Sequence, residues 1–299
     1  MGVLGRCLVA GLLVAVSGCS VQLAYNNLDR LARWSVGDYI DMTSDQRAYF
    51  DAAVEEVWVW HRGEHLPQYA DFLDSVAVRF VDGTSEREMQ QVVDQVVAWA
   101  EEVQARALPA TTEMLASLSD AQVRELAVTL EERNREIAEP ELGASPAEIR
   151  QLWVEEFSER FSRFSGKLTA VQQAYLRSQA ERYQPERVLW AEYRRRWQAD
   201  LLALLRFRQD RAGLERGLAE LARHRELYYG PRLTAIDDNN VKLLRESSVW
   251  LVNSLTDRQQ QRFRDRLGEL AEDFRALAAR ETTAPTAPLP CLAGCDGAS

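Results

Sequence analysis

The chain has 299 residues, of which 46% are hydrophobic and 27% are charged, and its formal net charge at pH 7 is −10. A chain of this length and composition can bury a large hydrophobic core, in one extended domain or in two. The excess of acidic side chains argues against nucleic acid as a partner, because phosphate backbones bind to basic protein surfaces.

The first 18 residues are typical of a bacterial signal peptide. Arg6 is their only charged residue, and an apolar run of ten residues, 7–16, follows it. A helix needs about 20 apolar residues to cross a bilayer, so this run is too short for a membrane span, but it has the length of the hydrophobic region of a signal peptide. The sequence Val-Ser-Gly-Cys that ends at Cys19 resembles the lipobox of bacterial lipoproteins.

The lipobox predicts cleavage before Cys19 and acylation of its thiol, so that the acyl chains bind the protein to the lipid bilayer. Cleavage removes Arg6 and thereby lowers the net charge from −10 to −11. The alternative is an ordinary secretory signal that happens to end in cysteine. Ser20 follows the lipobox cysteine. By resemblance to Gram-negative lipoproteins, a serine there indicates export to the outer membrane, with the protein facing the periplasm.

These patterns divide the chain into a signal peptide over 1–18, a lipidated N-terminus and short tether over 19–23, an all-helical domain over 24–282, and a flexible tail rich in proline, threonine and alanine over 283–299. Cys291 and Cys295 lie in this tail. In an oxidising envelope they could form a disulfide with each other, and the functional alternative is a redox or metal pair. No histidine is near them in the sequence, so we expect no metal site there.

Residues 28–279 have the hydrophobic periodicity of α-helices almost throughout. One apolar stripe consists of Leu189, Trp190, Tyr193, Trp197, Leu201, Leu204 and Leu205. Apolar residues that recur every three or four positions lie on one face of a helix with 3.6 residues per turn. No segment alternates strictly between apolar and polar residues with turns at both ends. The prediction is therefore an all-α fold, an elongated domain of about nine helices without a sheet.

Glycine and proline mark the predicted helix ends. These lie at Gly63–Pro67, Asp82–Gly83, Pro109, Pro140–Gly143, Gly166, Pro185 and Gly230–Pro231. Ser85 with Glu88, and Ser145 with Glu148, have the spacing of capping boxes, in which a hydroxyl and a carboxylate bind backbone N–H groups at the start of a helix. We therefore expect helices joined by short links.

One capping signal occurs four times. Each copy has an aliphatic residue, then serine or threonine, two further residues and glutamine. The hydroxyl residues and glutamines are Thr43 and Gln46, Ser119 and Gln122, Thr169 and Gln172, and Thr256 and Gln259. The intervals between the hydroxyl residues are 76, 50 and 87, so the copies do not form a solenoid of fixed period. A capping box preceded by a hydrophobic staple accounts for every residue of the motif without a functional role.

The copies that contain Leu168-Thr169 and Leu255-Thr256 are similar to the Leu-Thr-x-x-Gln motif of the Spy/CpxP periplasmic chaperones. In the other two copies, Met42 and Ser119 depart slightly from the pattern. The resemblance implies an exported helical cradle that binds unfolded polypeptides or sensor domains. Those chaperones usually carry two copies of the motif in a far shorter chain that is not lipidated.

A second resemblance covers most of the mature chain. Besides Cys19, the matching positions are Leu23 to Leu28, Trp34, Asp38, Tyr39, the stretch from Tyr229 to Asn240, Leu255, Thr256, Gln259, Arg266, Leu267 and Asp273. They look like an uncharacterised family of all-helical Gram-negative lipoproteins, a domain of unknown function. This family implies a fold and a location, but no activity.

One pattern points to enzymatic chemistry. His61-x-x-Glu64-His65 has the form of the inverted zinc-protease motif, in which two histidines on one helix face bind zinc and the glutamate is the general base. Gly63 and Pro67 argue against it, because they favour a helix end at this point. Histidines near a helix end could instead bind its last carbonyl groups. We therefore expect no catalytic residue, metal or cofactor, and a zinc-dependent hydrolase is the remote alternative.

The leading expectation is a membrane-anchored periplasmic lipoprotein that is not an enzyme. It would bind unfolded or envelope polypeptides in a chaperone-like manner, through shallow amphipathic grooves between helices. The alternative is a structural or assembly partner in the outer membrane, which would bind one stable partner without a general effect on aggregation.

Overall fold

The computed structural model describes residues 22, 25, 36–280, 289, 290 and 292. This part of the chain contains nine α-helices, α4 to α12, and no strand. The predicted all-α fold is therefore confirmed. The predicted signal peptide, Cys19, Cys291 and Cys295 lie outside the described residues.

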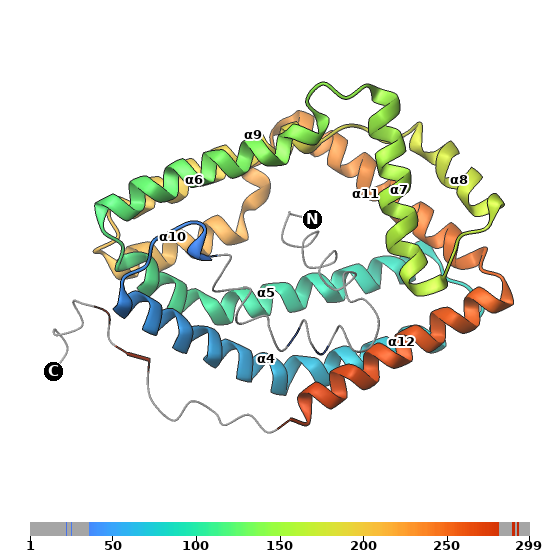
Figure 1. The fold of residues 1–299 in the computed structure, drawn as a ribbon, viewed down its shortest axis with the longest axis horizontal. Coiled ribbons are helices and arrows are strands. Elements are labelled where there is room, and N and C mark those ends of the chain that lie inside the picture. The colour runs from blue at the N-terminus through green and yellow to red at the C-terminus, as the bar shows by residue number, and fades with distance from the viewer. Residues whose placement is uncertain (1–21, 23–24, 26–35, 281–288, 291, 293–299) are drawn as a thin grey trace.

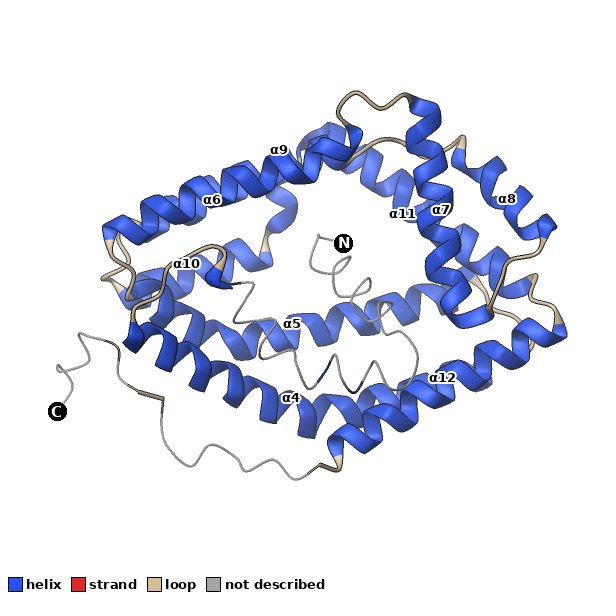
Figure 2. Cartoon of the chain, viewed as in Figure 1, coloured by secondary structure: helices blue, strands red, loops and turns tan. Residues whose placement is uncertain are grey.

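The helices are α4 (Ser44–Arg79), α5 (Glu86–Ala116), α6 (Asp120–Ala138), α7 (Pro146–Ser165), α8 (Ala170–Ala180), α9 (Arg187–Leu205), α10 (Arg211–Arg223), α11 (Gly230–Asn253) and α12 (Asp257–Ala278). Two short 3₁₀ helices, η1 (Glu139–Glu141) and η2 (Arg225–Tyr228), follow α6 and α10. The links between the helices are short (Figure 2).

The helices are arranged as the sides of an elongated frame (Figure 1). α12 packs along α4, and α4 packs on α5, so these three form one long side. α6 and α9 pack along each other on the opposite side, and α10 contacts both α9 and α5. α7, α8 and α11 close the end at which α12 begins.

The buried apolar side chains form separate clusters at the contacts between helices, rather than one central core. Met42, Leu118 and Leu205 belong to a cluster at the end of the frame where α4 and α6 begin. Leu66, Trp99 and Leu270 belong to another cluster, between α4, α5 and α12. Further clusters join α7 to α8 and α9 to α11. This distribution follows from the elongated shape, because each pair of helices buries its own apolar stripe.

The helix ends predicted at Gly63–Pro67 and at Pro109 are wrong, because α4 and α5 run through both prolines. A proline inside a helix leaves the carbonyl four residues earlier without its N–H partner. Here these carbonyls belong to Gly63 and Ala105, which are exposed, so water can bind them. Leu66 is buried beside Pro67, and the packing of α4 along α12 and α5 compensates for the lost hydrogen bond.

The other predicted ends coincide with links or with the start of α11. Gly83, in the link between α4 and α5, has a φ of 102°. A Cβ atom there would lie 2.6 Å from Oδ1 of Asn253. That side chain accepts a hydrogen bond from the backbone N–H of Thr84 and donates one to its carbonyl. Glycine is therefore required both by the backbone conformation and by the close approach of α11.

The predicted capping boxes are all present, at the starts of α4, α5, α6, α7, α8 and α12. Two helix starts had no predicted signal. The Glu141 carboxylate accepts a hydrogen bond of 2.8 Å from the backbone N–H of Arg187 at the start of α9. Asp210 accepts one of 3.0 Å from Gly213 at the start of α10. Glu141 is far from α9 in the sequence, so its role could not be read from local spacing.

Part of the segment expected to be flexible is packed on the helices. Leu292 is only 4% exposed and lies in the same cluster as Ile40 and Met42, and Leu289 packs against that cluster. These two leucines bury apolar surface against the cluster, and the flexible tail over 283–299 stays a prediction.

Candidate functional site

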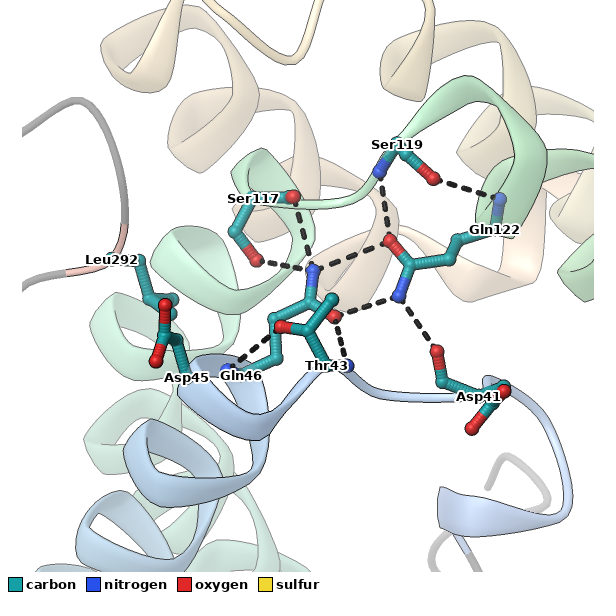
Figure 3. A pocket seen from close by; sticks show the side chains of 8 residues that line it. All are labelled: Asp41, Thr43, Asp45, Gln46, Ser117, Ser119, Gln122 and Leu292. Atoms are coloured by element: carbon teal, nitrogen blue, oxygen red, sulfur yellow. Dashed lines mark hydrogen bonds between the residues drawn. The ribbon is translucent and has the colours of Figure 1, made fainter.

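The four capping motifs come together as two pairs. The first pair joins the start of α4 to the start of α6 (Figure 3). Nε2 of Gln122 donates to Oε1 of Gln46 at 2.6 Å, and Nε2 of Gln46 donates to Oε1 of Gln122 at 3.3 Å. Both side chains are buried, and each oxygen also accepts the backbone N–H of its own N-cap residue, Thr43 or Ser119.

The second pair joins the start of α8 to the start of α12. Nε2 of Gln172 donates to Oε1 of Gln259 at 3.1 Å, and Nε2 of Gln259 donates to Oε1 of Gln172 at 3.0 Å. The N-cap backbone N–H groups of Thr169 and Thr256 complete the pattern. The two pairs lie at opposite ends of the frame, where α4 and α12 begin (Figure 1).

The second N–H of each glutamine side chain donates to a backbone carbonyl. This carbonyl belongs to the residue five positions before the partner glutamine in the sequence. Gln46 and Gln172 donate to the carbonyls of Ser117 and Ser254, both at 3.0 Å. Gln122 and Gln259 donate to those of Asp41 and Lys167, at 2.8 and 3.1 Å. Each amide thus uses both donors and its oxygen in hydrogen bonds. The two ends of the frame are held by the same set of contacts.

An open hollow lies beside the first pair, and Figure 3 shows the side chains that line it. They are Asp41, Thr43, Asp45, Gln46, Ser117, Ser119, Gln122 and Leu292. The glutamine and N-cap groups in it are bound to one another, so they hold helices together rather than point at an open site. The structural interpretation of the motif is therefore supported, with a tertiary contact added to the capping.

His61 and His65 lie on the inner face of α4 in a chain of polar side chains. The Tyr25 hydroxyl is 2.9 Å from Nδ1 of His61, and Nε2 of His61 is 3.2 Å from the Tyr69 hydroxyl. Nδ1 of His65 is 3.0 Å from the same hydroxyl, and Nε2 of His65 is 3.2 Å from the carboxylate of Glu102 on α5. His65, Tyr25 and Tyr69 are buried.

The ionised Glu102 carboxylate fixes the direction of every hydrogen bond in this chain. A carboxylate only accepts, so Nε2 of a neutral His65 carries the proton and its Nδ1 accepts from the Tyr69 hydroxyl. The Tyr69 oxygen then accepts from Nε2–H of His61, whose Nδ1 accepts from the Tyr25 hydroxyl. One exposed carboxylate thereby sets the tautomer of both histidines.

Burial keeps the two histidines and the two tyrosines in the uncharged protonation states that this chain of hydrogen bonds requires. Burial, and after it the positive charge of a protonated His65, lowers the pKa of His61 from 6.5 to about 4. Burial also lowers the pKa of His65, although Glu102 opposes this effect. The pKa values of Tyr25 and Tyr69 are raised by burial. At neutral pH both histidines are therefore uncharged and both hydroxyls keep their protons.

Glu64, which would be the general base in the remote zinc-protease alternative, is exposed and does not join this chain. Both ring nitrogens of His61 and of His65 are already in hydrogen bonds, which leaves none directed at a metal or a substrate. In the described part of the chain, no group of three histidine, cysteine, aspartate or glutamate side chains is placed to hold a metal ion. The motif spacing is thus present on one helix, but its histidines bind tyrosine and Glu102.

Gln22 and Tyr25, which precede α4 in the sequence, contact α12 and α4 respectively. Tyr25 is 6% exposed, and its ring centroid is 4.0 Å from the ring centroid of Trp58. The Arg62 guanidinium carbon is 5.5 Å from the centroid of the Tyr25 ring. Gln22 donates to Oδ1 of Asp273 at 2.8 Å and accepts from Arg280 at 2.8 Å. No motif predicted these contacts, because they join the start of the sequence to the middle of α4 and the end of α12.

Comparison with known proteins places the chain in a family without assigning an activity. None of the helices in the described part is long and apolar enough to cross a membrane. No curated protein and no solved structure matches the chain. The sequence model of a family of unknown function, DUF6279, matches residues 38–234, which extend from just before α4 into α11. The match covers more than half of the chain, so the protein belongs to the DUF6279 family.

Proposed function

We propose that the protein is a lipid-anchored binding protein of the bacterial envelope, exported to the outer membrane and facing the periplasm, and not an enzyme. Its helical frame would bind unfolded or envelope polypeptides in a chaperone-like manner. The observation that carries the proposal is the exposure of several large apolar side chains on the helical frame, and the four Ser/Thr-x-x-Gln motifs support it only through their resemblance to the Spy/CpxP pattern. The Spy/CpxP chaperones usually carry two copies, whereas this chain has four, joined as two pairs with the same contacts.

Exposed apolar side chains provide contacts for a client polypeptide. Phe207 and Leu227 are each 76% exposed, Val171 is 70% exposed and Leu142 is 62% exposed. They lie singly in loops, in η2 and at the start of α8, so each would contribute a small contact area. Weak contacts of this kind suit a protein that binds many unfolded chains, because affinity then does not depend on one client sequence.

The test is suppression of aggregation by residues 20–299, with two unrelated unfolded proteins at substoichiometric to equimolar ratios. We expect suppression of both. Phe207→Ser combined with Leu227→Ser should weaken it without lowering the melting temperature, since both side chains are exposed. Glu101→Ser combined with Glu132→Ser, also at exposed positions, is the matched control. No suppression at any ratio would contradict the chaperone-like activity and favour a structural partner in the outer membrane.

The anchor has its own test. Cys19→Ser should abolish acylation and cleavage before residue 19, measured by the intact mass of the protein purified from the membrane and the soluble fractions. Acylated, processed Cys19→Ser protein would contradict the assignment of the anchor.

A further inference from the structure

Two leucines near the C-terminal end of the sequence pack on the frame beside the first glutamine pair. Leu289 and Leu292 are the only large aliphatic or aromatic side chains in residues 281–299. Leu292 is 4% exposed and also lines the open hollow in Figure 3. Leu289 is partly buried against the same apolar cluster. We call this the α4–α6 cluster, and its buried members include Ile40, Met42, Leu118 and Leu205.

The spacing of the two leucines fits an extended segment that turns once every three residues. Leu289, Pro290 and Leu292 lie in neither a helix nor a strand. Leu289 stands between Pro288 and Pro290 in the sequence. Proline fixes its own φ and disfavours the helical conformation of the residue before it. In polyproline II, positions i and i+3 lie on the same side, which agrees with the packing of both leucines on one cluster.

Apolar contacts join the described residues of this segment to the helices. Leu289, Pro290 and Leu292 make no hydrogen bond and no ion pair with the rest of the described chain. The burial of apolar surface is not directional. Another polypeptide segment with two leucines at this spacing would therefore make the same contacts.

We propose that the α4–α6 cluster binds client polypeptides through two leucines three residues apart, and that Leu289 and Leu292 occupy this site until a client displaces them. The inference rests on the proposed function and names the place where a client binds. Polyproline II segments suit such a site, because proline restricts the free segment and little conformational freedom is lost on binding. The resident leucines keep the apolar surface covered while no client is bound, which limits self-association.

The resident segment has an advantage over a free polypeptide. Residues 279–288 connect it to the end of α12. A short flexible link gives a bound segment an effective concentration in the millimolar range. Removal of the two leucines should therefore raise the affinity of the α4–α6 cluster for a polypeptide added in solution.

The experiment measures the binding of a separate tail peptide. The probe is a fluorescent peptide of residues 284–297 with both cysteines replaced by serine, titrated into residues 20–299 and followed by fluorescence anisotropy. Leu289→Ser combined with Leu292→Ser removes the resident side chains without shortening the chain. We expect the peptide to bind this double variant about tenfold more tightly than the unchanged protein, because the resident segment no longer competes.

Two controls separate this site from a general gain in exposed apolar surface. Leu142→Ser replaces a leucine that is 62% exposed and is not a member of the α4–α6 cluster, and it should leave the affinity for the peptide unchanged. A peptide with both leucines replaced by serine should not bind to any of these proteins. Leu289→Ala alone changes only the partly buried leucine, so it should remain folded if the double variant does not, and it should raise the affinity in the same direction.

An unfolded client then competes for the same site. Reduced, carboxymethylated α-lactalbumin should displace the peptide from the double variant. A peptide that binds no variant, or binds the variants no more tightly than the unchanged protein, would overturn the inference and show that the two leucines only stabilise the fold. Aggregation suppressed by a protein from which the client does not displace the peptide would overturn this site and leave the proposed function standing. Peptide binding without suppression of aggregation by either protein would overturn both.

Discussion

The glutamine pairs and the histidine chain bury polar side chains in two different ways. Each glutamine pair binds two amides to each other and to nearby backbone, and an amide has the same donors and acceptors at any pH. The histidine chain depends on the charge of Glu102 and on two uncharged rings. Both arrangements satisfy their buried groups, but only the second one changes when protons are added.

The largest effect should come from breaking a glutamine pair. Gln172→Ala removes the side-chain oxygen that accepts the backbone N–H of Thr169 at the start of α8, which costs about 1 kcal/mol. It also leaves the buried amide of Gln259 and the carbonyl of Ser254 without their partner, at about 3 kcal/mol. We expect the free energy of unfolding to fall by about 4 kcal/mol in total, measured by urea denaturation. Gln261→Ala, which removes an exposed glutamine of α12, is the control and should change it by less than about 0.5 kcal/mol.

The histidine chain should make the protein less stable in acid. The pKa of His61 is about 4 in the folded protein and 6.5 as its ordinary value. Between these values the unfolded chain binds more protons, so the free energy of unfolding falls as the pH is lowered from 6.5 towards 4. The expected loss is about 3 kcal/mol. His65, whose pKa is also lowered, adds to it in the same direction.

Carboxylates titrate in the same range, so the measurement compares variants. His61→Gln removes the titrating ring, and its stability should depend less on pH between 6.5 and 4 than that of the unchanged protein. Gln172→Ala should keep the full dependence, because it alters only the neutral pair. A His61→Gln protein with an unchanged pH dependence would show that the buried ring does not set the response to acid.

The two glutamine pairs should act as independent units. In a double-mutant cycle, Gln46→Ala and Gln122→Ala should have an interaction energy of about 1–2 kcal/mol, since each removes the partner of the other. Gln46→Ala and Gln172→Ala lie at opposite ends of the frame and should be additive within about 0.5 kcal/mol. An interaction energy of similar size between Gln46→Ala and Gln172→Ala would contradict the independence of the two glutamine pairs. It would indicate that the two ends of the frame unfold cooperatively.

The same comparison explains how much could be predicted from the sequence. The all-α fold and every capping box follow from local spacing, because the two partners of a capping box lie within one turn of the helix. Which motif pairs with which could not be predicted, since intervals of 76 and 87 residues carry no information on contact. The proline errors in α4 and α5 have a similar origin, because tertiary packing outweighed a local signal.

The candidate site was predicted only in part. His61 and His65 were singled out by a spacing that does place them on one helix face. Their partners were missed, because Tyr25, Tyr69 and Glu102 belong to no motif and come from the sequence before α4, from α4 and from α5. Tyr69 follows His65 by four residues, so helix geometry places both side chains on one face of α4. This spacing does not show that the two side chains are buried or that α5 packs against them.

The smallest expected effect tests the direction of the hydrogen bonds. Glu102→Gln replaces a group that only accepts with an amide that can also donate. An amide N–H directed at Nε2 of His65 would move that proton to Nδ1 and reverse the donor at each step as far as Tyr25. Glu102 is 55% exposed at its side chain, so the free energy of unfolding should change by less than about 1 kcal/mol.

The effect of Glu102→Gln should appear instead in the ¹⁵N chemical shifts of the two imidazole rings. The unchanged protein should have its proton on Nε2 of both rings, and Glu102→Gln should give a second population with the proton on Nδ1 of both. Two rings that keep the proton on Nε2 in Glu102→Gln would show that the direction is set inside the buried chain, by Tyr25 or Tyr69, and not by the carboxylate on α5.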